Sequence, residues 1–143
     1  MACGKIALNW GPVELAIESF LIKLRHNHRA TVTERMPLEF GRKVRALKEM
    51  MKLDPAHAGL LDLLRPWLGK AKELHHIRTD VVHCTCQGTN IDGVLIFGKS
   101  DQKRGVAYTE TQYTVAALER ASDEMRQVRW EMEPIFQSLR TLS

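Results

Sequence analysis

The sequence predicts an all-α fold, an up-and-down bundle of four helices with a small β-hairpin inserted before the last helix. Four segments repeat apolar residues at steps of three and four, which is the period of an amphipathic helix. Short connections separate these segments, and each apolar stripe must be buried against another. After residue 83 the pattern changes to a glycine-punctuated segment with two short β-prone runs.

Size and composition fit one domain that spans residues 1–143. The chain is 44% apolar and 27% charged, as is usual for a globular protein with its own core. No apolar run approaches the roughly 20 residues that span a bilayer, and no signal peptide is evident. We therefore expect a cytoplasmic protein without a membrane partner, whose three cysteines are free thiols. The net charge of +4 permits an anionic partner such as RNA but does not require one.

The first helix is predicted over residues 6–25. Gly11-Pro12 interrupts its start, because proline removes a helical hydrogen bond and clashes with the preceding turn. The helix is therefore expected either to begin near Asn9 as its cap or to kink there. Glu14 lies at the margin of the stripe. The apolar stripe consists of Trp10, Val13, Ile17, Phe20, Leu21 and Leu24.

A polar loop is predicted at 26–35, and the second and third helices come after it in turn. Pro37 suits the first position of a helix that extends to about Leu53. The third helix is expected to start at an aspartate cap and a proline, residues 54–55, and to run to about residue 81. Pro66 either kinks this helix or divides it, and division would give five helices.

The hairpin and the last helix complete the prediction. Two strands are expected at Val94–Phe97 and Val106–Thr109, with a polar turn between them. Residues 109–112, TETQ, fit a capping box, so a long helix is expected from about Tyr113 to Leu139.

The stretch HHIRTDVVHCTC, residues 75–86, carries the candidate chemistry. Arg78 supplies a permanent positive charge whose fork matches phosphate, and His83 can give or take a proton near neutral pH. Together they suit phosphodiester chemistry without a metal or another cofactor. Five helical steps turn about 500°, so the two side chains point roughly 140° apart on a straight helix. The helix must therefore end or unwind at His83, or a second copy of the chain must complete the site.

Two other interpretations of this stretch stay open. His83, Cys84 and Cys86 could supply three zinc ligands, although adjacent residues rarely both reach one ion and no second ligand pair is present. Alternatively, Arg78 and His83 cap carbonyls at a helix C-terminus, and the cysteines are small buried residues.

The arginine and histidine, separated by four residues at the end of a late helix, resemble the motif of the HEPN superfamily. The segment 10–14, WGPVE, is similar to the W-G-x-L-E opening of a bacterial branch of small HEPN-like proteins. Residues 77–83, IRTDVVH, stand where that branch commonly has IRNxLVHG. A short strand-rich insert and a long final helix then follow, so the resemblance spans most of the chain.

The resemblance implies a homodimer in which the two motif helices meet, and a metal-independent ribonuclease of toxin or defence type. His83 would be the general acid and base, and Arg78 would hold the scissile phosphate. Thr79 or Asp80 would orient His83, and Glu14 would pair with Arg78 or His83.

Two positions depart from the family pattern. Thr79 replaces the usual asparagine, aspartate or histidine, and Cys84 replaces a glycine. The alternative function is a non-catalytic helical dimer, which would bind a nucleotide or a protein such as an antitoxin or regulator.

Overall fold

The computed structural model describes residues 1–27, 35–101 and 106–141. Most of the predicted loop at 26–35 therefore lies outside the described residues, although His26 and Asn27 end the first helix. The helices and strands, in chain order, are α1 (Ala2–Asn27), α2 (Phe40–Lys52), α3 (Pro55–His83), β1 (Thr85–Thr89), β2 (Leu95–Asp101), β3 (Val106–Tyr113) and α4 (Val115–Thr141).

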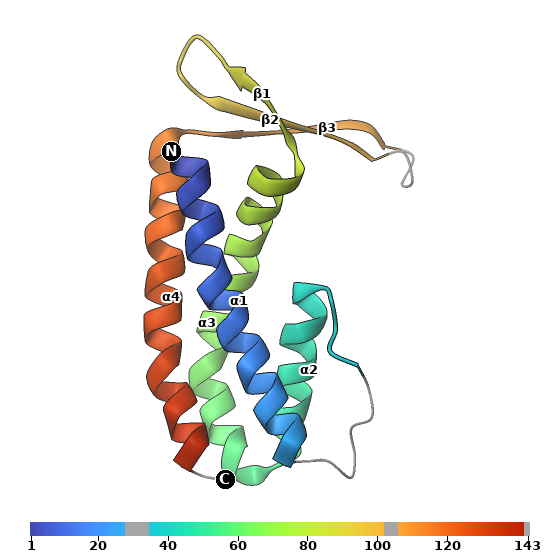
Figure 1. Ribbon diagram of the computed structural model, residues 1–143, viewed down its shortest axis with the longest axis vertical. Helices are drawn as coiled ribbons and strands as arrows, with labels where there is room; N and C mark the ends of the chain where they lie inside the picture. The colour runs from blue at the N-terminus through green and yellow to red at the C-terminus, as the bar shows by residue number, and fades with distance from the viewer. Residues whose placement is uncertain (28–34, 102–105, 142–143) are drawn as a thin grey trace.

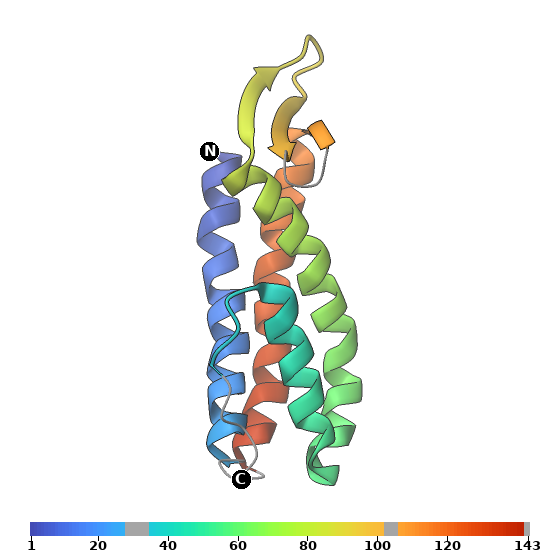
Figure 2. The same cartoon turned by 90° about the vertical axis from the view of Figure 1, so that its right-hand side faces the viewer.

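The four helices form a bundle, but the predicted up-and-down order is wrong. Figures 1 and 2 show α1, α2 and α4 running in the same direction, with α3 alone opposed to them. Contacts agree, because Trp10 meets Phe40 and the later residue Glu14 meets Lys43. Along α4, Asn9 contacts Ser122 and Phe20 stacks on Phe136. Because Phe40 contacts Trp10 and Lys43 contacts Glu14, α2 starts beside the middle of α1.

Helices α1 and α3 each continue through an internal proline, which settles two alternatives left open by the sequence. α1 runs from Ala2 through Pro12, so Asn9 is no cap; its side-chain amide donates to Ser122 Oγ over 2.7 Å. α3 passes through Pro66 unbroken, so the five-helix alternative is wrong. Both prolines are exposed, and water can satisfy the carbonyl that each leaves without a helical partner.

The ends of α2 and α3 depend on particular contacts. α2 begins at Phe40 rather than Pro37, because the buried Phe40 ring packs edge-on against Trp10. The start of α3 is as predicted: Asp54 Oδ1 accepts a hydrogen bond from the Ala56 amide over 2.9 Å, and Pro55 follows the cap.

Between α3 and α4 lies a three-stranded antiparallel sheet in the order β1-β2-β3, so the protein is α+β rather than all-α. The two predicted strands are present and longer than expected. Strand β1 was not predicted, and all five of its residues are exposed. Gly88 has a φ of +117° where the β1–β2 register shifts, a conformation that favours glycine.

The predicted capping box is wrong, because residues 109–112 belong to β3 and pair with β2. The cap of α4 is Thr114, whose Oγ1 accepts a hydrogen bond from the Ala117 amide over 3.0 Å. Tyr113 therefore ends the sheet rather than beginning the helix. Its hydroxyl donates to Asp80 Oδ2 over 2.6 Å, which ties the sheet to the last turn of α3.

The core lies between the four helices and includes the predicted stripe of α1 together with Leu61, Leu64, Leu68, Met125, Val128 and Met132. From the sheet, only Phe97 joins the buried apolar residues of the described part. No helix in the described ranges is long and apolar enough to cross a membrane. The sheet therefore acts as an attachment to the end of the bundle, next to His83.

Candidate functional site

An open pocket of about 700 Å³ is lined by residues from the last turns of α3, from α1 and from the start of α2. Most of its polar groups come from α3 and are cationic or can become so: Lys72, His75, His76, Arg78 and His83. Two carboxylates, Glu14 and Glu39, line the same pocket. The pocket therefore joins the residues of the predicted motif to a single concave surface.

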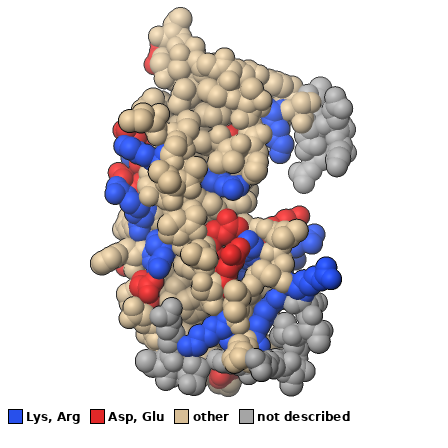
Figure 3. All heavy atoms as spheres, viewed as in Figure 1, with Lys and Arg blue, Asp and Glu red and all other residues tan. Residues whose placement is uncertain are grey.

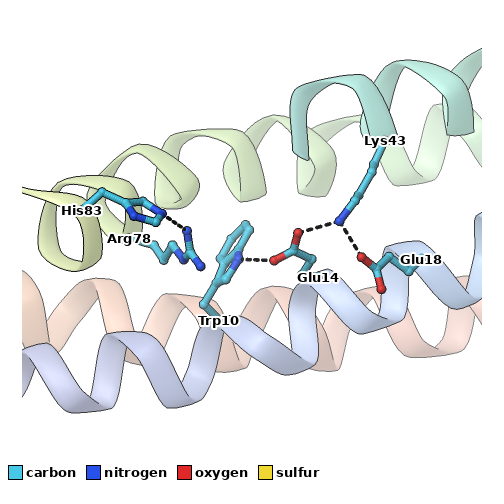
Figure 4. A network of polar contacts seen from close by, with 6 residues as sticks. All are labelled: Trp10, Glu14, Glu18, Lys43, Arg78 and His83. Carbon is cyan, nitrogen blue, oxygen red and sulfur yellow. Dashed lines mark hydrogen bonds and ion pairs between the residues drawn. The ribbon is translucent and has the colours of Figure 1, made fainter. Parts of the chain in front are cut away.

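Arg78 and His83 meet within one chain. The guanidinium Nη1 of Arg78 lies 2.9 Å from His83 Nε2, and α3 ends at His83 (Figure 4). The expected helix end at His83 is thus confirmed, and the long arginine side chain bridges the angle between the two positions. Because a guanidinium can only donate, Nε2 must be the acceptor in this contact. The imidazole is then neutral, with its proton on Nδ1 and its lone pair directed at Arg78.

Glu14 reaches the pocket but does not pair as expected. Its carboxylate accepts hydrogen bonds from Lys43 Nζ over 2.7 Å and from Trp10 Nε1 over 2.9 Å (Figure 4). Within the described residues no hydrogen bond or ion pair joins it to Arg78 or His83. Burial favours the protonated acid, but the bonds from Lys43 and Trp10 and the charges of Lys43 and Arg78 outweigh it, so the pKa of Glu14 is lowered.

Lys43 is a site residue that the sequence prediction missed. It is only 5% exposed and contacts both Glu14 and Glu18. Burial disfavours its ammonium, yet the hydrogen bonds and charges of the two carboxylates raise the pKa of Lys43. Two features of the sequence indicate this contact. Lys43 lies four residues before Leu47, on the apolar face of its helix, and Glu14 and Glu18 lie four residues apart on one face of another helix.

Asp80 does not orient His83. Its Oδ2 accepts the hydrogen bond from the Tyr113 hydroxyl, and its Oδ1 lies 3.9 Å from Cys84 Sγ. Thr79 lines the pocket, and its hydroxyl is buried without a hydrogen-bond partner among the described residues. The hydroxyl is therefore a donor and acceptor available to a ligand or to a bound water.

His75 forms the inner wall of the pocket. Its ring stacks on Phe40, with centroids 4.8 Å apart, and tilts against Trp10. Burial and the charge of Arg78 lower the pKa of His75, so the neutral ring is favoured. His76, next along the helix, is exposed and points away from the core.

The zinc interpretation finds no support in the part of the chain that is described. No group of three His, Cys, Asp or Glu side chains there could hold a metal ion. Cys84 and Cys86 are free thiols, as is Cys3, which confirms the expectation for the cysteines.

Comparison of the chain with protein-family models, with curated proteins and with solved structures finds no match.

Replacing Lys43 should destabilise the bundle, because it would leave the carboxylates of Glu14 and Glu18 without a compensating positive charge. Removing one partner of a fully buried ion pair costs roughly 3–5 kcal/mol. Both carboxylates keep some contact with solvent, so we expect a smaller loss of about 2 kcal/mol for Lys43→Met in urea unfolding. The triple variant with Glu14→Gln and Glu18→Gln should recover much of that loss. Lys52→Met, an exposed change on the same helix, should have little effect; an equal loss there would contradict this interpretation.

Folding stability should fall as the pH drops below 6.5, the ordinary pKa of histidine. In that range the unfolded chain takes up a proton at His75 that the folded chain, with its lowered pKa, still resists. The loss continues until the pH reaches the lowered value. His75→Phe keeps a ring against Phe40 and should flatten the slope of the unfolding free energy between about pH 6.5 and 5. Equal slopes for the two proteins would exclude His75 as the cause.

Proposed function

We propose that this chain is a metal-independent endoribonuclease of HEPN type that uses Arg78 and His83. The observation that carries the proposal is the 2.9 Å contact between the two side chains in an open pocket that also holds Lys72 and two further histidines. A phosphodiester is the anion that such a pair can both bind and transform. The motif resemblance in residues 77–83 supports the same chemistry.

Arg78 has two roles in the proposed reaction. Without substrate, its guanidinium donates to His83 Nε2 and holds that lone pair in place. When a phosphate enters, its non-bridging oxygens are better acceptors for the guanidinium, because they carry negative charge. When the Arg78 guanidinium donates its hydrogen bond to the phosphate instead, His83 Nε2 is free to accept a proton. Substrate binding therefore activates His83 as the general base. The guanidinium then stabilises the charge that accumulates on phosphorus oxygens.

His83 moves the proton. Its Nε2 takes the proton of the 2′-hydroxyl while the 2′-oxygen forms a bond to phosphorus, and the bond from phosphorus to the 5′-oxygen breaks. The imidazolium returns the proton to the leaving 5′-oxygen. The products are a 2′,3′-cyclic phosphate and a free 5′-hydroxyl, so DNA, which has no 2′-hydroxyl, is not cleaved. Among the described residues the hydroxyl of Thr79 has no hydrogen-bond partner, and Thr79 lines the same pocket, so it would bond a phosphate oxygen that reaches it.

Cleavage of single-stranded RNA in EDTA should therefore produce 2′,3′-cyclic phosphate ends. We expect His83→Ala and Arg78→Ala each to lower the rate by about 100-fold or more. The control Arg126→Ala removes an exposed arginine on α4, which pairs only locally with Asp123, and should leave the rate unchanged. The absence of cleavage by folded protein, or cleavage that survives both site variants, would refute the proposal.

The outer face of α1 favours a second function, the assembly of two chains. Leu8, Leu15 and Ile22 recur at every seventh position and are 76%, 63% and 59% exposed. They lie on the side of α1 opposite the core, where Figure 3 shows largely uncharged surface with charged side chains to either side. Exposed apolar stripes of this length usually mark an interface.

A second copy of α1 is the partner that this face fits. Gly4, Gly11 and Ser19 alternate with the large residues in an arc of about 80°. The Ser19 hydroxyl is already bonded to the Leu15 carbonyl, and a Cβ at either glycine would meet only open space. In an antiparallel pair related by a two-fold axis near Val13, Ile22 of one chain lies over Gly4 of the other, and Leu15 over Gly11. The face is thus complementary to itself, as a symmetric dimer requires.

Leu15→Lys should convert a dimer to a monomer in sedimentation or light-scattering measurements, because it places charge at the centre of this face. Leu63→Lys is the matched control, since Leu63 is 61% exposed on α3. Because one chain already brings Arg78 and His83 together, the monomer should retain RNA cleavage. A protein that is monomeric before substitution would rule out this assembly.

A further inference from the structure

A row of basic residues follows α3 away from the candidate active site. Positions 65, 72, 76 and 83 lie within an arc of about 40° on the helix, and all four are exposed. They hold Arg65, Lys72, His76 and His83. Among the described residues, only Arg65 of these four has a carboxylate partner, Asp62 at 3.1 Å.

A second row lies on α2. Positions 45, 48 and 52 fall within an arc of about 60° and hold Arg45, Lys48 and Lys52. No carboxylate within the described ranges forms an ion pair with any of these three residues. The row begins at Gly41, which has no side chain and lines the same pocket as Lys72.

The two rows border the line along which α2 packs against α3, and these two helices lie side by side in Figure 2. We call the surface along this line the α2–α3 groove. Burial, followed by the charges of Lys72, Arg65 and Lys52, lowers the pKa of Lys48. Cations from both helices are therefore close enough to repel one another. A polyanion in the groove would relieve this repulsion, and its phosphates would bind along a path that leads to Arg78 and His83.

The length of the path fits several nucleotides. From Arg65 to His83, α3 rises about 27 Å, which is comparable to grooves that hold roughly 4–16 nucleotides of a single strand. The pocket at the end of the path offers the exposed ring of His76 as a surface on which an unstacked base can lie. A duplex keeps its bases stacked and spreads its phosphates over two strands, so it matches one path and one pocket poorly.

We infer that the α2–α3 groove binds a single RNA strand by its phosphates and leads it to the Arg78–His83 pair, where one base enters the pocket. The inference rests on the proposed ribonuclease function for the end of the path, but strand binding along the groove can be measured without cleavage. It names single-stranded RNA as the substrate class and Arg45, Lys48, Lys52 and Lys72 as residues that position the strand.

The test uses the full chain with His83→Ala, so that fluorescent oligouridines of 3–12 nucleotides remain uncleaved during anisotropy titrations. Affinity should rise with length up to about the span of the groove and should then level off. A matched duplex should bind at least 10-fold more weakly. Adding Lys48→Glu and Lys52→Glu should weaken binding of the single strand by 10-fold or more and reduce the salt slope by about 1.4, as expected for two lost phosphate contacts.

The matched control adds Lys99→Glu and Arg120→Glu, an equal charge change at exposed positions on β2 and α4, and should keep most of the affinity. Equal losses in the groove and control variants would overturn the inference, because binding would then follow net charge alone. Duplex binding as tight as single-strand binding would also overturn it. Groove-dependent binding by a native chain that never cleaves RNA would support the strand path and refute only the ribonuclease proposal.

Discussion

Lys43 enters the bundle between two carboxylates of α1, and much of the arrangement depends on that contact. A buried ammonium needs compensating charge, and Glu14 and Glu18 supply it from successive turns of one helix. The contact fixes how far along α1 the shorter helix α2 can lie, and Phe40 against Trp10 fixes the same register with apolar contacts. Together they leave the last turns of α3 uncovered by α2. The pocket exists because α2 starts where it does.

The same contact explains why the acidic residue nearest the motif does not act on it directly. Glu14 is bound by Lys43 and Trp10, so its charge reaches Arg78 only through space. Asp80 is likewise occupied, because it anchors the sheet through Tyr113. Within the described residues, Arg78 is thus the hydrogen-bond partner that His83 retains. In the proposed reaction these two side chains would carry the chemistry, while Glu14, Lys43 and Asp80 hold the surrounding elements together.

Much of this could be predicted from the sequence, and the failures have physical reasons. Helical periodicity located all four helices. The angle between Arg78 and His83 left two alternatives, a helix end at His83 or a second copy of the chain, and the structure has the helix end. Helix direction could not be predicted, because an apolar stripe such as that of α2 is satisfied by parallel and antiparallel neighbours alike. Strand β1 has no buried face and therefore no alternating pattern. The capping box failed because TETQ also alternates as a strand should, and pairing with β2 prevailed over the local cap.

The direction of the helices has an electrostatic consequence. Each helix carries about half a positive charge at its N-terminus and half a negative charge at its C-terminus. In a bundle of alternating helices these partial charges cancel at both ends, but here α1 and α4 both begin at the end that bears the sheet, and only α3 finishes there. The start of α2 adds a further positive terminus beside the pocket. The positive termini of α1 and α4 therefore outnumber the one negative terminus of α3, which ends at His83, so the backbone adds a net positive partial charge to the end that bears the sheet.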